Sequence, residues 1–218
     1  MAKKNKVAVK IINEINSFQN YLVTIGLAPI YNTAKLYDNN KVMWGKSENL
    51  SILLKEGHYE DIYKKLHESK NYSFKFIDGS IFQLSYTIVN NVITKMRLAY
   101  YPYPKTISYN DDMESYDLEC EHIDMLDKYV VSTPIRIDYA PKDHEEIKHP
   151  KTHLHLGQIE GCRIPLKSPI MPNKFFKFIF YNFYDKVFDR YFLKYNFETE
   201  EIEASITLVE QKHGHICI

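Results

Sequence analysis

Three histidines lie close together in the segment His149-Pro-Lys-Thr-His153-Leu-His155-Leu-Gly157. Imidazole accepts and donates protons near neutral pH, so a group of histidines can carry out general acid–base catalysis. Side chains two residues apart in a β-strand point to the same face, and we therefore expect His153 and His155 to project side by side. Any chemistry that this protein performs is expected to centre on this segment.

The preceding predicted strand carries Arg136 and Asp138, which are also two residues apart. If the loop between the two strands joins antiparallel neighbours, this arginine and this aspartate share a face with the two strand histidines. His149 can then approach from the loop and Arg163 from the next strand. The resulting group of imidazole, carboxylate and guanidinium side chains offers proton transfer beside a phosphate-binding surface.

This set of side chains suits metal-independent cleavage of RNA. One base removes the proton of the 2′-hydroxyl group, one acid protonates the leaving oxygen, and arginine stabilises the negative charge that develops around phosphorus. No cofactor is predicted for this reaction. We assign His153 and His155 to proton transfer, Asp138 to orienting a histidine, and Arg136 and Arg163 to binding the phosphate. His149 is counted with the catalytic residues because it can approach from the loop.

Two other interpretations use the same residues. His149, His153 and His155 could supply three nitrogen ligands to zinc or another transition metal and leave a fourth position for water. Alternatively, the histidines and the Arg-Asp pair form a structural network of hydrogen bonds that braces the sheet against a long helix. The spacing of the residues does not distinguish these interpretations.

Charge and composition limit the partners and the number of domains. The 28 basic and 28 acidic side chains cancel, so contact with RNA must be local, since no overall positive field attracts nucleic acid. Hydrophobic residues make up 44% of the chain and charged residues 26%, which is typical of a folded protein. At 218 residues, a single α+β domain that spans residues 1–218 is expected.

Cysteine usage and hydropathy indicate a cytoplasmic protein. The three cysteines, Cys120, Cys162 and Cys217, form no CxxC motif, so neither a disulfide framework nor a zinc knuckle is predicted. The N-terminus lacks the apolar region of a signal peptide, and no apolar run reaches the ~20 residues that a transmembrane helix needs. We therefore expect a cytoplasmic location and no membrane partner.

The periodicity of the apolar residues predicts an α+β fold. Helical patterns cover residues 7–25 and 58–69, and an aromatic helix over residues 172–195 follows Pro172, which is tolerated in a first turn. Alternating patterns and turn residues predict strands. These strands lie at residues 72–77, 81–89, 92–101, 129–139, 153–158 and 162–166. The expected architecture is one mainly antiparallel sheet of about six strands, with the N-terminal helix and the long aromatic C-terminal helix packed on it.

The helix predicted over residues 172–195 is aromatic around most of its circumference. A helix of that kind must be covered on more than one side. It either lies entirely in the core across the sheet or packs on the sheet with one face and forms a homodimer with the other, since large exposed apolar patches mark interfaces.

Several motifs resemble those of a bacterial family known only as a domain of unknown function. The likeness covers about residues 40 to 195, and it implies membership of that family without any particular activity. The motifs are Asp78-Gly79-Ser80 with Gln83, Arg97-Leu-Ala-Tyr-Tyr-Pro102, Arg136-Ile-Asp138, His149-Pro150, His153-Leu-His155-Leu-Gly157, Arg163-Ile-Pro165, and Pro172 with residues 175–184.

A fainter likeness concerns small bacterial toxins of the TumE type, which act in toxin–antitoxin pairs. The chain is similar to them in the order of an Asp-Gly-Ser turn, an Arg-x-Asp-Tyr strand end and a His-Pro pair before the histidines. The resemblance implies an RNase-like effector whose site residues correspond to Arg136, Asp138, His149, His153 and His155.

Two functions follow as hypotheses. The first is a toxin-like or anti-phage defence effector that acts as a metal-independent endoribonuclease through the His/Arg/Asp group. The alternative is a non-enzymatic partner or regulatory protein of such a system, with a protein partner encoded nearby and with the histidines structural or metal-binding.

Overall fold

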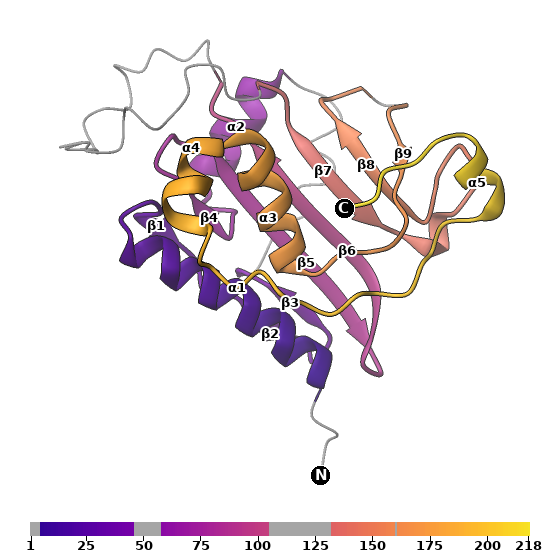
Figure 1. Ribbon diagram of the computed structural model, residues 1–218, viewed down its shortest axis with the longest axis horizontal. Helices are drawn as coiled ribbons and strands as arrows, with labels where there is room; N and C mark the ends of the chain where they lie inside the picture. Colours follow the sequence, from indigo (N-terminus) through magenta and orange to yellow (C-terminus); the bar gives the residue numbers. More distant parts are fainter. Residues whose placement is uncertain (1–4, 46–57, 105–131, 160) are drawn as a thin grey trace.

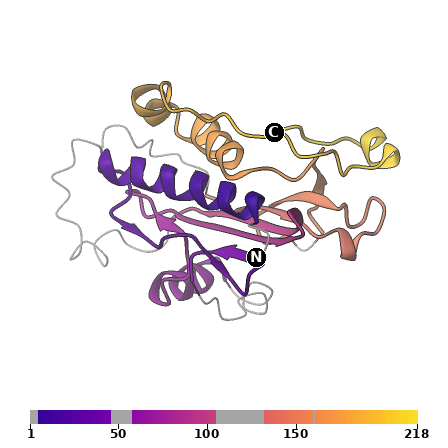
Figure 2. The same cartoon turned by 90° about the horizontal axis from the view of Figure 1, so that it is seen from below.

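The structure of the protein is a computed structural model that describes residues 5–45, 58–104, 132–159 and 161–218. It has three layers, with two helices and the C-terminal segment on one face of a sheet and one further helix on the other face (Figure 1, Figure 2). The predicted α+β class is confirmed. No helix of the described part of the chain is long and apolar enough to cross a membrane.

The sheet of the described residues has nine strands instead of about six. The strands are β1 (Ile30–Tyr31), β2 (Lys35–Tyr37), β3 (Lys41–Met43), β4 (Phe74–Lys75), β5 (Ile81–Val89), β6 (Val92–Tyr101), β7 (Ile135–Tyr139), β8 (Thr152–Leu156) and β9 (Ile164–Pro165). They run in the order β1-β4-β5-β6-β7-β8-β9, and β3, which also pairs with β2, lies beside β5. All of these pairs are antiparallel. The additional strands have two or three residues, too few for an alternating pattern to reveal them.

Two predicted features fall partly or wholly outside the described residues. The strand expected over residues 129–139 is described from residue 132 onward, where β7 begins at Ile135. Cys120 is not among the described residues, whereas Cys162 and Cys217 are both free thiols. The described cysteines therefore form no disulfide bond.

The main core lies between the sheet and two helices, α1 (Lys6–Thr24) and α3 (Pro172–Phe183). Helix α1 begins at Asn5, whose side chain accepts a hydrogen bond from the backbone N–H of Ala8, a common N-terminal cap. The stripe that α1 buries ends in aromatic contacts, and the Phe18 ring stacks on Phe176 of α3 with 4.1 Å between centroids. The buried stripe consists of Ala8, Ile11, Ile15, Phe18 and Leu22. This periodicity is the one that predicted the N-terminal helix.

A smaller core lies on the opposite face of the sheet under α2 (Tyr59–Glu68). Helix α2 buries Ile62 and Leu66 in a cluster that includes Ala99 and Tyr101 of β6. From Met96 to Tyr101 of β6, odd-numbered residues therefore point toward the face of α2 and even-numbered residues toward α1 and α3. Beyond α2, the same face of β6 to β9 carries polar side chains.

The single long helix predicted over residues 172–195 is wrong, because the chain leaves the helical conformation at Tyr184. Tyr184 has φ of −140° and ψ of 53°. It is followed by α4 (Asp185–Val187) and a π-helical turn, η4 (Phe188–Phe192). The hydroxyl of Tyr184 donates a hydrogen bond to Asp78 Oδ2 at 2.6 Å, so a contact with the turn between β4 and β5 holds this residue out of helical geometry.

Candidate functional site

The sheet register aligns the predicted site residues in two rows across neighbouring strands. In one row, Arg97 of β6 lies opposite Asp138 of β7, which lies opposite His153 of β8. In the next row, Arg136 lies opposite His155. The prediction that the arginine, the aspartate and the two strand histidines share one face is therefore confirmed. This face is the one that carries α2.

Asp138 lies between two guanidinium groups. Its Oδ1 accepts a hydrogen bond from Arg97 Nε at 2.8 Å, and its Oδ2 lies 2.9 Å from Arg136 Nε. Burial alone would raise the pKa of this carboxyl, but the charges of Arg97 and Arg136 outweigh it and lower the pKa to about 2. Asp138 is therefore an anion at neutral pH, and it neutralises part of the positive charge of the site.

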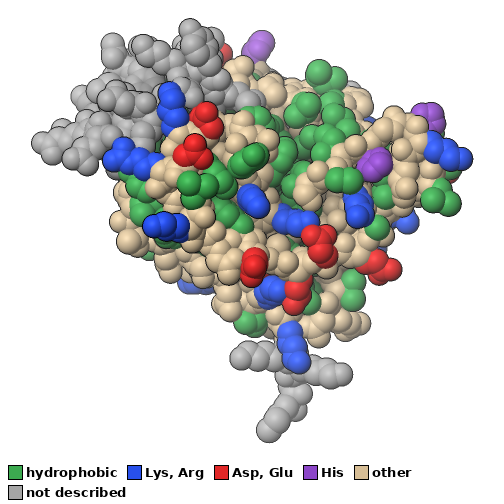
Figure 3. Space-filling view, viewed as in Figure 1, with side chains coloured by type: hydrophobic (Ala, Val, Ile, Leu, Met, Phe, Trp, Pro, Cys, Tyr) green, Lys and Arg blue, Asp and Glu red, His purple; other side chains and the backbone are tan. Residues whose placement is uncertain are grey.

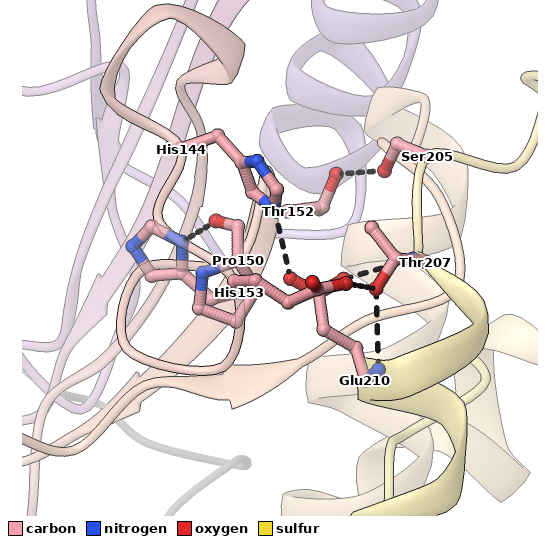
Figure 4. A network of polar contacts seen from close by, with 8 residues as sticks. His144, Pro150, Thr152, His153, Ser205, Thr207 and Glu210 are labelled. Atoms are coloured by element: carbon pink, nitrogen blue, oxygen red, sulfur yellow. Dashed lines mark hydrogen bonds and ion pairs between the residues drawn. The ribbon is translucent and has the colours of Figure 1, made fainter.

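His153 is held in one tautomer by the backbone. Its Nδ1–H donates to the carbonyl oxygen of Pro150 at 2.7 Å, as Figure 4 shows. Because the neutral ring carries one proton, Nε2 then has a free lone pair. Burial lowers the pKa of His153, so the ring is neutral at pH 7 and Nε2 can accept a proton or bind a metal ion.

His155 lies close to Asp138 without a hydrogen bond to it. His155 Nε2 is 3.6 Å from Asp138 Oδ2, which is beyond hydrogen-bond distance. Burial, followed by the positive charge of Arg136, lowers the pKa of His155 to about 3. Asp138 thus pairs with the arginines, whereas orientation of a histidine by this carboxylate stays a prediction.

His149 completes a row of three imidazole rings. Its ring centroid lies 4.7 Å from that of His153, which in turn lies 4.7 Å from that of His155, and both pairs meet edge to face. Arg163 lies one residue before β9, the strand that pairs with β8. The structure therefore places both of these residues next to the strand histidines, as predicted.

Buried polar atoms without a hydrogen-bond partner concentrate at this site. Among the described residues seven such side-chain atoms occur, and five of them belong to this face of the sheet. They are Arg136 Nε, Arg163 Nε, His149 Nδ1, His155 Nε2 and the hydroxyl of Tyr101. Since buried polar groups are nearly always paired, such a concentration indicates a surface that is completed by a ligand.

Two members of the site were not assigned from the sequence. Arg97 makes the closest pair with Asp138. Burial raises the pKa of the Tyr101 hydroxyl, and the nearby charges of Arg136 and Arg97 reduce that rise. Both residues stand on β6 within the Arg97-Leu-Ala-Tyr-Tyr-Pro102 motif. Their spacing of four along an alternating strand was the only signal available, since it places both on one face.

A metal ion would meet a different set of ligands from the one that we predicted. One ligand atom each from Asp138, His153 and His155 lies within 4.8 Å of the others, whereas we had expected His149 in place of the aspartate. The hydrogen bond from His153 to Pro150 is of the kind that orients metal-binding histidines. However, both oxygens of Asp138 already face arginines, and the charges of these two arginines oppose a further cation there.

The structural interpretation in its original form is wrong. The predicted network was to brace the sheet against the long helix, but α3 packs on the opposite face, against residues such as Leu98, Ile137 and Leu154. The histidines alternate with Leu154 along β8 and therefore point away from α3. Whatever the histidines do, they do not join the sheet to that helix.

One comparison with known proteins identifies a related group. Residues 27–218 match the sequence model of a family described as "Uncharacterized conserved protein (DUF2290)". No curated protein and no solved structure matches the chain. All the residues of the site lie within the matched range.

Proposed function

The chain belongs to this family of uncharacterised conserved proteins, and from its site we propose that it binds phosphodiesters and cleaves RNA without a metal ion. The observation that supports this function best is the group of five buried polar atoms on one face of the sheet that have no hydrogen-bond partner among the described residues. Most of them are hydrogen-bond donors, which is the complement of a phosphate group.

The charges of the site favour an anion. Among the described residues, the guanidinium groups of Arg97 and Arg136 flank one carboxylate, that of Asp138, and Arg163 lies near the buried imidazoles of His153 and His155, which are neutral. The surplus is positive, and a planar guanidinium group binds two oxygens of a phosphate. The side chains of Arg97 and Arg136 are 34% and 26% exposed, so a ligand can reach them from solvent.

The reaction uses two of the histidines in different protonation states. His153 Nε2 takes the proton of the 2′-hydroxyl, the 2′-oxygen bonds to phosphorus, and the bond to the 5′-oxygen breaks to leave a 2′,3′-cyclic phosphate. The phosphate charge offsets that of Arg136, which raises the pKa of His155 and lets its imidazolium protonate the departing 5′-oxygen. Arg136 and Arg163 stabilise the added negative charge of the transition state, and His149 packs against the ring of His153.

Two measurements test this function. Purified protein should cleave single-stranded RNA in the presence of EDTA, and the His153→Ala variant should lose on the order of 10²-fold or more of the rate. Activity that disappears with EDTA and returns with zinc would favour the metal site of Asp138, His153 and His155 instead. Full activity of the variant would contradict the assignment of His153.

The biological role proposed for this activity is that of a toxin-like or anti-phage effector. Inducible expression in a bacterial host compares the wild type with the His153→Ala, His155→Ala double variant by growth and by integrity of total RNA. We expect growth arrest with loss of RNA for the wild type alone. Normal growth of both strains would contradict the effector role.

A second candidate is a protein that acts by binding a partner protein. A cleft of about 470 Å³ beside α3 and η4 has walls of mixed polarity, which include Tyr181, Leu193 and Phe197. Tyr181 is 62% and Leu193 69% exposed, and Figure 3 shows hydrophobic side chains among lysines and arginines on this face. A second copy of the chain or a protein encoded nearby would cover it, and copurification that a Leu193→Asp variant abolishes would support this role.

A further inference from the structure

The loop between β7 and β8 forms a tight hairpin that carries His149 and Pro150, the residue whose carbonyl oxygen binds His153. Glu145 and His149 pair through their backbones, with N···O distances of 3.0 and 2.7 Å. At the tip Ile147 has φ of +69°, a conformation that costs a β-branched residue about 1–3 kcal/mol. The hairpin therefore needs contacts from outside to keep this shape, in which Pro150 meets His153.

The C-terminal segment provides these contacts. His144 Nε2 donates to Glu210 Oε1 at 3.1 Å, and Thr207 Oγ1 donates to Glu146 Oε1 at 2.8 Å. Figure 4 shows how the carboxylate of Glu210 reaches from α5 (Leu208–Lys212) to the hairpin. Glu210 is fully buried, and its Oε2 accepts from the backbone N–H of Thr207, so both of its oxygens are in use.

The C-terminal segment is itself held in place at both ends. Helix α5 has five residues, too few to be stable alone. Before it, the backbone N–H of Ser205 donates to Lys167 O at 2.9 Å, and after it, that of Ile216 donates to Pro165 O at 2.9 Å. The segment is thereby fixed to the end of β9, next to the strand that carries the histidines.

From this chain of contacts we infer that Glu210 is a positioning residue for the site. It does not touch the histidine row. Glu210 holds His144, and this contact keeps the strained tip of the hairpin in place. The carbonyl of Pro150 therefore stays where it fixes the tautomer of His153. This inference rests on the proposed function for its catalytic consequence, whereas its structural consequence, the tautomer of His153, can be observed without any activity.

The test compares two substitutions of the same residue. His144→Ala removes the donor to Glu210, whereas His144→Gln supplies an amide N–H in a similar place. His213→Ala, an exposed histidine at the end of α5, is the matched control. The tautomer of His153 is read from ¹⁵N chemical shifts of labelled histidine, and RNA binding and cleavage are measured on the same samples.

We expect the Nδ1–H tautomer of His153 alone in the wild type, the Gln variant and the control, and a mixture of tautomers in His144→Ala. The cleavage rate of His144→Ala should fall by about tenfold or more at unchanged RNA affinity, because only orientation is lost. Glu210→Ala should have the same two effects.

Opposite outcomes separate the two proposals. If the wild type does not cleave RNA but the tautomer of His153 changes in His144→Ala, the proposed function fails and the positioning role stands. If the wild type cleaves RNA and neither His144→Ala nor Glu210→Ala alters the tautomer or the rate, the positioning role is overturned. Circular dichroism shows whether each variant is folded. If one is unfolded, Thr207→Val takes its place in the comparison, because it removes the other contact to the hairpin, that with Glu146.

Discussion

Two aspartates on opposite faces of the same sheet have very different surroundings. Asp78, on the side of α3, accepts hydrogen bonds from the backbone and hydroxyl of Ser80 at 2.8 and 2.6 Å and from the hydroxyl of Tyr184 at 2.6 Å. The proton of Tyr100 then goes to the oxygen of Tyr184, 2.8 Å away. Every side-chain group of this cluster is paired.

The cluster around Asp138 is built from charges and remains incomplete. Its carboxylate meets two arginines, while Nε2 of His155 and the hydroxyl of Tyr101 have no hydrogen-bond partner among the described residues. The two clusters therefore differ in whether they contain polar groups without a hydrogen-bond partner. A saturated network stabilises the fold and offers nothing to a ligand, whereas unsatisfied donors around a positive surplus are groups that a ligand would complete.

The largest expected difference between the two clusters is in how much a substitution in each lowers the stability of the fold. Asp78→Ala leaves three donors without an acceptor, and we expect it to lower the free energy of unfolding by about 3 kcal/mol. Arg136→Met removes one of the two cations beside Asp138 but leaves the hydrogen bonds from Arg97, so it should lower the free energy of unfolding by less, about 1 kcal/mol. Urea unfolding measures both values.

The affinity for RNA should show the reverse order. Arg136→Met should weaken binding on the order of tenfold or more through loss of a charge-assisted contact, while Asp78→Ala, measured well below its melting temperature, should bind as the wild type does. If Asp78→Ala abolished binding and Arg136→Met did not, the division into a structural and a ligand-binding cluster would be wrong.

The parts of this comparison that the sequence predicted are those that depend on local spacing. His153 with His155 and Arg136 with Asp138 are each two apart, so a shared face followed once the loop between their strands was taken to join antiparallel neighbours. Arg97 was missed as a partner of Asp138, because their alignment depends on the register between β6 and β7, which lie far apart in the chain.

The end of α3 was unpredictable for a related reason. The aromatic pattern continues unbroken past Tyr184. The helix ends at this residue because the hydroxyl of Tyr184 binds Asp78, which lies 106 residues earlier in the chain. Helical periodicity carries no information about such a contact. The saturated cluster was therefore invisible in the sequence, although its Asp-Gly-Ser turn was recognisable.

Acid should sharpen the comparison, because the two carboxyls are shifted in opposite directions. The pKa of Asp138 is lowered from 3.8 to about 2, so its contribution is present above pH 3.8 and is lost as the pH falls through 2. The shift corresponds to about 2 kcal/mol. Burial raises the pKa of Asp78. The folded state therefore binds this proton more readily than the unfolded state, and protonation of Asp78 adds stability as the pH falls.

The measurement is the free energy of unfolding as a function of pH. Asp138→Asn should flatten the decline of this free energy between about pH 4 and pH 2. Asp78→Asn should act above about pH 4, where it removes the gain in stability that protonation of Asp78 gives as the pH falls. Equal curves for the wild type and Asp138→Asn would mean that the two arginines do not stabilise this carboxylate.

The smallest expected effect is uptake of a proton when the site is filled. His155 has a pKa of about 3, lowered by burial and then by Arg136, and a bound phosphodiester offsets that second charge. The pKa then rises, so near pH 5 binding takes up a fraction of a proton and affinity increases as the pH falls. A thymidine dinucleotide is a suitable ligand, since it cannot be cleaved and has no group that titrates between pH 4 and pH 8. Calorimetry in two buffers of different ionisation enthalpy measures the uptake, which His155→Asn should abolish while Tyr184→Phe leaves it unchanged; uptake that survives in His155→Asn would assign the proton to another histidine of the row.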